Sequence, residues 1–147
     1  TFVEQRALGA VFVAPFQMKT GADLPGREPD LLFVASDRLD RIKANHLAGP
    51  ADLAIEVVSP ESRLRDRGAK LGEYELGGVR EYWILDPDQQ LADFHVLSAV
   101  GHYERRSFDA SGIYRSATVD GFWLREAWLR AAVPPSTLDV LRELGLI

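Results

Sequence analysis

The chain has 147 residues, of which 46% are hydrophobic and 27% charged, enough for one globular domain with a core of useful size. Its net charge of -5 argues against a general nucleic-acid coat protein, because non-specific DNA binding depends on neutralising phosphates with Lys and Arg. The lack of cysteine excludes disulfides, thiolate catalysis and cysteine-zinc sites, and no apolar run reaches the roughly 20 residues of a membrane span. These features favour a cytoplasmic protein with no membrane partner.

Hydrophobic runs separated by Gly, Pro and charged turns predict the elements in chain order. In the first third of the chain we expect a helix end over 1–8, a strand over 11–19, a loop over 20–28, a strand over 31–34 and a short helix over 36–47 capped by Ser36. A strand over 53–58 follows, and then a helix from Asp66 to about Leu76 that Gly77-Gly78 ends. The remainder should form strands over 80–85, 92–97 and 103–108, a strand and a helical turn within 114–129, and a final helix over 137–144. This order predicts an α/β (α+β) fold with a mixed central β-sheet flanked by helices.

Glu56 is the one charged residue in the apolar run from Leu53 to Val58, which has the composition of a strand buried on both faces. An unpaired carboxylate in such surroundings costs several kcal/mol, so a cation, a metal ion or a proton must neutralise it. The function of the chain therefore depends on what Glu56 faces.

A second carboxylate, Asp30, directly follows Pro29 at the start of the preceding predicted strand. Lys70 lies fourteen residues after Glu56 on the next predicted helix, with Tyr74 one turn further along the same face. Two carboxylates that leave water positions open are ligands that Mg²⁺ or Mn²⁺ accepts, and a neighbouring lysine can hold a phosphate. We expect the two carboxylates to lie roughly 4 to 5 Å apart, and their repulsion to raise the pKa of one of them.

Four segments together resemble the Uma-two family of restriction endonucleases, a branch of the PD-(D/E)XK nuclease superfamily. They are Pro29-Asp30, the run from Asp52 through Glu56 to Pro60, the pair Lys70 and Tyr74, and the run from Gly78 to Pro87. The resemblance spans roughly residues 9–97, and the order and spacing of the motifs are more specific than any one of them.

The resemblance implies a restriction-endonuclease-like core in which Asp30 and Glu56 hold Mg²⁺ or Mn²⁺ and take part in DNA hydrolysis. The superfamily pattern has a lysine two residues after the glutamate, where this chain has Val58. The resemblance therefore implies that the catalytic lysine has moved to Lys70 on the following helix, with Tyr74 as an accessory residue. Cutting both DNA strands needs two sites, which favours a homodimer.

Family members also begin with a hairpin and a longer first helix. We therefore expect residues 1–147 to form a single restriction-endonuclease-like domain that lacks the N-terminal hairpin and part of that helix.

Each candidate residue also has a structural explanation that the sequence leaves open. Asp30 can cap a turn, as Asp after Pro commonly does. Glu56 can form an ion pair with one of the nearby arginines, and Lys70 can pair with Asp66 at i, i+4 on a solvated helix face.

The arginines at positions 63, 65 and 67 form the densest basic stretch, beside the expected site. They can contact DNA phosphates there or simply occupy a solvated turn. Two functions consequently remain open: a Mg²⁺-dependent endonuclease, and a catalytically silent nuclease-fold module that binds nucleic acid or a protein.

Overall fold

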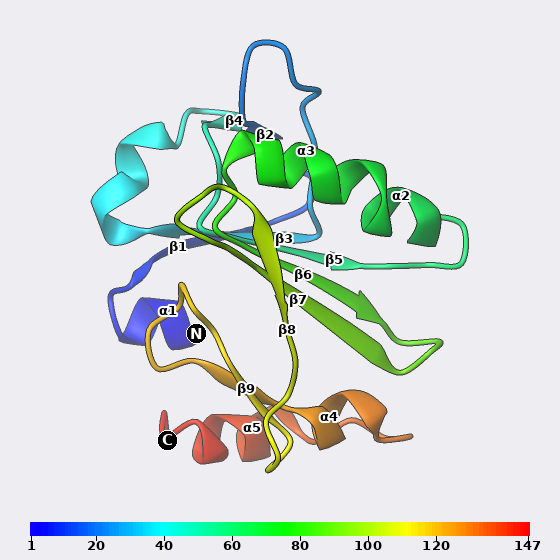
Figure 1. Cartoon of the computed structure of the whole chain (residues 1–147). Helices are drawn as coiled ribbons and strands as arrows, with labels where there is room; N and C mark the ends of the chain where they lie inside the picture. Colours follow the sequence, from blue (N-terminus) through cyan, green and yellow to red (C-terminus); the bar gives the residue numbers. More distant parts are fainter.

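The computed structural model describes residues 1–147 and is organised around one six-stranded mixed sheet (Figure 1). The strands, in their spatial order, are β1 (Gly9–Val13), β3 (Leu31–Ala35), β5 (Leu53–Val57), β6 (Glu81–Asp86), β7 (Leu91–Leu97) and β8 (Tyr103–Arg106). β5 and β6 pair in parallel, and the other neighbours in this sheet are antiparallel.

Helices cover both faces of this sheet, which confirms the predicted fold class (Figure 1). The upper face carries α2 (Arg63–Arg67) and α3 (Ala69–Gly77), together with the short parallel pair β2 (Gln17–Lys19) and β4 (His46–Ala48). The lower layer contains α1 (Phe2–Gln5), the antiparallel pair β9 (Ile113–Arg115) and β10 (Trp123–Arg125), α4 (Glu126–Arg130) and α5 (Thr137–Glu143). None of these helices is long and apolar enough to cross a membrane.

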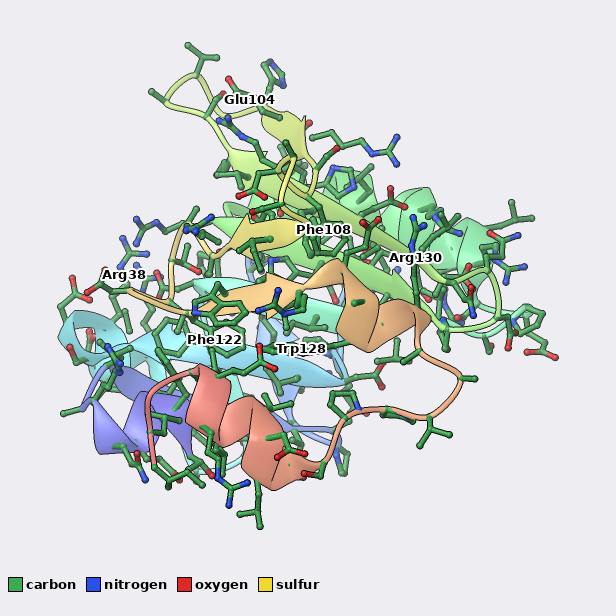
Figure 2. All side chains as sticks on the ribbon, turned by 90° about the horizontal axis from the view of Figure 1, so that it is seen from below. Arg38, Glu104, Phe108, Phe122, Trp128 and Arg130 are labelled. Carbon is green, nitrogen blue, oxygen red and sulfur yellow. The ribbon has the colours of Figure 1, made fainter.

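Two apolar cores lie on the two faces of the sheet because successive strand residues point to opposite sides. The upper core includes Ala54 and Ile84, and the lower core includes Leu53 and Trp83. Aromatic side chains dominate the lower core, where Trp83 stacks on Phe122 with ring centroids 6.2 Å apart. Figure 2 shows the partly buried members Phe108, Phe122 and Trp128 from below.

Glu56 belongs to the upper face, because it follows Ala54 by two residues on β5. The first half of β5 is buried on both sides, as predicted, but Val57 at its end is 53% exposed. The carboxylate thus lies under the helical layer, near the open end of the strand.

The strand predicted over residues 11–19 is wrong, because the structure divides this segment between two sheets. Pro15 lies between β1 and β2 and has no backbone N–H to donate to a sheet ladder. The helix predicted over residues 36–47 is also wrong in extent. It is a 3-10 helix, η1 (Ser36–Arg41), followed by β4, and its N-cap is Ala35, so the prediction that Ser36 caps it is also wrong.

The single helix predicted from Asp66 is instead two helices, α2 and α3, separated at Gly68. Asp66 lies inside α2 and does not cap α3. The predicted end is confirmed, because Gly78 adopts the left-handed conformation (φ 83°) that commonly terminates a helix.

Candidate functional site

Asp30, directly before β3, and Glu56, on the antiparallel neighbour β5, lie at the same end of this strand pair. Leu31 pairs with Ile55, so continuing this register by one position places residue 30 opposite residue 56. Directly opposed residues of an antiparallel pair point to the same face. Asp30 is exposed, and its Oδ2 accepts a hydrogen bond from the Val57 backbone N–H at 2.7 Å.

Glu56 is only 4% exposed and is held by two donors from α3. Its Oε1 accepts hydrogen bonds from Lys70 Nζ at 2.9 Å and from the Tyr74 hydroxyl at 3.0 Å. Lys70 and Tyr74 are four residues apart on a helix, so both side chains reach the same carboxylate. The structure therefore brings together Glu56, Lys70 and Tyr74, as the sequence analysis expected.

Burial has the largest effect on the pKa of the Glu56 carboxyl. It raises the pKa of Glu56, and the hydrogen bond and charge of Lys70 act in the opposite direction. The rise in pKa was expected from repulsion by Asp30, whereas the structure assigns it first to burial. Burial also raises the pKa of Tyr74 far above its usual value, so its hydroxyl remains a donor to Glu56 at neutral pH.

Asp66 also contacts Lys70, although its position in the sequence predicted only a helix cap or a surface partner of Lys70. It is 1% exposed, and its Oδ1 lies 2.8 Å from Lys70 Nζ. Lys70 thus pairs with Asp66 and Glu56 together while being only 7% exposed, so the alternative of a pair on a solvated helix face is wrong. The i, i+4 spacing predicted the Lys70–Asp66 pair, but the neighbouring Arg65 and Arg67 made this segment look solvent-exposed in the sequence.

Val58 occupies the position where the superfamily pattern has a lysine. It is 2% exposed and belongs to the upper core, on the same face as Glu56. Lys70 brings an ammonium group to Glu56 from the helix above, so this cation reaches the carboxylate without an extra charge on β5.

The three arginines of α2 lie in two different environments. Arg63 forms a two-point contact with Asp86, at 2.6 and 3.1 Å, and Arg67 bridges Asp86 and Asp93 at 3.1 Å each. Arg65 is the most exposed of the three, with 58% of its side chain accessible. The alternative that one of these arginines neutralises Glu56 is therefore wrong, and their contact with DNA phosphates stays a prediction.

The carboxylate oxygens of Asp30 and Glu56 are chemically suited to bind a divalent cation. Asp30 uses one carboxylate oxygen for Val57 and Glu56 uses one for Lys70 and Tyr74, so each keeps a second oxygen without a protein partner. Hard oxygen ligands suit Mg²⁺ and Mn²⁺, and Mg²⁺ usually keeps several waters beside one or two carboxylates. No group of three or more His, Cys, Asp or Glu residues is arranged to hold a metal ion, so a cation bound by these two carboxylates would need waters in its other positions.

Two comparisons with known proteins are consistent with this geometry. The family model Uma2, described as "Putative restriction endonuclease", matches residues 1–129, which confirms the resemblance drawn from the motifs. The fold is similar to a crystal structure described as "a putative nuclease belonging to DUF820" from Anabaena variabilis ATCC 29413. That comparison has a TM-score of 0.68 at 19% identity and covers 87% of this chain and 71% of the other. No curated protein matches the sequence.

Proposed function

The chain belongs to the Uma2 family, and on that premise we propose that it is a metal-dependent endonuclease that hydrolyses phosphodiester bonds in DNA. The observation that supports this proposal is that Asp30 and Glu56 lie at the same end of the β3–β5 pair, with Lys70 Nζ 2.9 Å from Glu56. A buried carboxylate, an adjacent exposed carboxylate and a lysine form a site for a cation and a phosphate.

Asp30 and Glu56 would hold Mg²⁺ or Mn²⁺, which would stabilise negative charge on the phosphate. In hydrolysis a water oxygen gives up a proton and bonds to phosphorus, the bond from phosphorus to one ester oxygen breaks, and the leaving oxygen takes up a proton from the solvent. Negative charge grows on the phosphate oxygens as this occurs. The Lys70 ammonium supplies a fixed positive charge at the site, and Tyr74 holds the Glu56 carboxylate in place through its hydroxyl.

The same proposal covers the whole molecule. We place the protein in the cytoplasm as one restriction-endonuclease-like domain that acts as a homodimer, because one chain carries one such site and cutting both DNA strands needs two.

Plasmid cleavage in Mg²⁺ or Mn²⁺ tests the assignment of the residues. Asp30→Asn and Glu56→Ala should abolish cleavage and weaken Mn²⁺ binding in calorimetry. Lys70→Ala should keep Mn²⁺ binding but lose roughly 100-fold or more in rate, as expected for a group acting in the transition state. Lys19 is an exposed lysine on β2, so Lys19→Ala is the matched control and should cleave at the parent rate.

A second function has support from one observation. Lys70 is already shared by two carboxylates in a buried cluster, an arrangement that also suits a purely structural ion network in a silent module. If the parent protein binds neither Mn²⁺ nor DNA and never cuts, the nuclease proposal is wrong. Equal cleavage by Lys70→Ala and the parent would refute the role of Lys70 alone.

A further inference from the structure

Arg27 is a cation paired with α3, the helix that carries Lys70 and Tyr74, and the function proposed above does not use it. Its Nε and Nη2 donate to the two oxygens of Glu73, at 2.7 and 2.8 Å. The side chains of Arg27 and Glu73 are 26% and 23% exposed, so the pair lies at the surface without being fully solvated. A two-point contact of this kind fixes the plane of the guanidinium.

The backbone of Arg27 is held as firmly as its side chain. Arg27 donates to the Met18 carbonyl at 3.0 Å, and Met18 donates to the Arg27 carbonyl at 2.7 Å. Met18 is fully buried, which anchors the end of the 20–28 loop to the upper core. Arg27 is three residues before Asp30, so this anchor also limits the positions of the backbone that leads to Asp30.

Glu73 ties Arg27 to the helical turn that carries the other site residues. It follows Lys70 by three residues and directly precedes Tyr74 on α3. The hydrogen bond from Arg27 lowers the pKa of Glu73, and the charge of Lys70 contributes to the same shift. The hydrogen bond to Glu73 raises the pKa of Arg27, and the charge of Glu56 adds to this rise. Glu73 therefore links Arg27 to the turn of α3 that carries Lys70 and Tyr74.

The arginines of α2 have other partners than Arg27. Arg63 donates to Asp86, at the end of β6, and Arg67 donates to Asp86 and Asp93, so neither pairs with a residue of α3. Of the five N–H donors of an arginine, Arg27 uses two for Glu73 and has no other side-chain bond, so three remain for a ligand.

We propose that Arg27 binds a non-bridging oxygen of the DNA phosphodiester at the Asp30–Glu56 site, with Glu73 as the residue that positions its guanidinium. A planar, permanently charged fork with free donors is well suited to phosphate, and Glu73 limits the orientations it can adopt. This inference rests on the function proposed above, because it requires DNA to be the ligand.

DNA binding without divalent metal separates this role from catalysis. Fluorescence anisotropy of a labelled duplex in EDTA, over a range of salt concentrations, should show about tenfold weaker binding for Arg27→Ala. The slope of log affinity against log salt should fall by about 1, as expected for one lost phosphate contact. Glu73→Gln should weaken binding less and leave this slope unchanged, because the positive charge remains.

Arg142 provides the matched control, since it is an exposed arginine on α5 with an i, i+3 pair to Asp139. Arg142→Ala should bind DNA like the parent. Should Arg27→Ala fold poorly in thermal melts, Arg27→Gln serves instead, because glutamine can still donate to Glu73 but carries no charge.

The outcomes distinguish the two proposals. Parent-like affinity and salt slope in the Arg27 variants, with a parent that cuts DNA, would overturn the role of Arg27 and leave the nuclease assignment standing. A parent that neither binds nor cuts DNA would overturn both.

Discussion

At the scale of single residues, the buried carboxylate Asp86 shows how the charges of α2 are used. Its side chain is fully buried and accepts from Arg63, from Arg67 and from the Gln89 backbone N–H. The Arg63 guanidinium, followed by the Gln89 N–H and Arg67, holds the pKa of Asp86 well below its usual range. Asp86 thereby fastens α2 to the end of β6.

The lowered pKa gives Asp86→Asn a defined pH dependence. The stabilisation that comes with a depressed pKa is fully present above the ordinary value of 3.8 and is lost as the pH falls through the folded value. Asp86→Asn should therefore lower Tm at pH 7 by on the order of 5 °C, and by progressively less as the pH falls toward about 3. Calorimetric melts of both proteins across this range would measure the difference.

Asp88 lies in the same turn and is exposed, so Asp88→Asn is the control and should leave Tm nearly unchanged. A Tm difference for Asp86→Asn that stays constant down to acid pH would contradict this account of the ion pair.

At the scale of elements, the junction of α2 and α3 sets where Lys70 lies. A Cβ added at Gly68 would lie 2.7 Å from the Leu64 carbonyl oxygen of α2, so the chain turns too tightly at the end of α2 to accept a side chain there. Lys70 follows two residues later in the first turn of α3, whereas Asp66 belongs to α2. The junction therefore controls the Glu56–Lys70–Asp66 cluster.

Two glycine substitutions separate crowding at the junction from ordinary helix propensity. Gly68→Ala should destabilise the protein by about 1–3 kcal/mol, because the added methyl must displace backbone. Gly72 is exposed within α3, and a Cβ added there would have no neighbouring atom within 4 Å, so Gly72→Ala should stabilise by about 0.5–1 kcal/mol. Urea unfolding of both variants measures these changes, and an equal effect of the two would show that the junction is not crowded.

At the scale of the whole molecule, the two faces of the sheet have different tasks. The upper face combines an apolar core with the buried charges of the candidate site, and the lower face carries an aromatic core covered by α1, α4 and α5 (Figures 1 and 2). Leu144, at the end of α5, is 8% exposed within the lower core. The last helix therefore contributes to stability on the face opposite the site.

Removing the Leu144 side chain should affect stability and leave the site intact. Leu144→Ala should cost about 2–3 kcal/mol, from the lost burial and the cavity left behind, while Mn²⁺ binding at low temperature is unchanged. Leu138 lies on the same helix and is 55% exposed, so Leu138→Ala should cost little. Urea unfolding measures both, and a neutral Leu144→Ala would show that α5 packs loosely on the sheet.

The sequence by itself determined most of the sheet and the main residues of the site. Apolar runs bounded by turn residues predicted the strands at Glu56, at Trp83 and after Asp30, because strand burial follows from local alternation and composition. The spacing of Lys70 and Tyr74 placed both on one helix face, since helical geometry is also local. The sequence predicted one strand over residues 11–19 because apolar residues lie on both sides of Pro15, although proline has no N–H to donate to a sheet ladder.

Only the tertiary structure decided which charges meet. Glu81 illustrates this: it is completely buried and accepts from Trp83, Tyr114, Ser116 and Thr118, side chains or backbone that lie up to 37 residues away. Neither this cluster nor the Arg27–Glu73 pair, 46 residues apart, has a sequence signal. A hydrogen bond depends on positions within about 3 Å, and between distant segments those positions are set by how the layers pack and not by local periodicity.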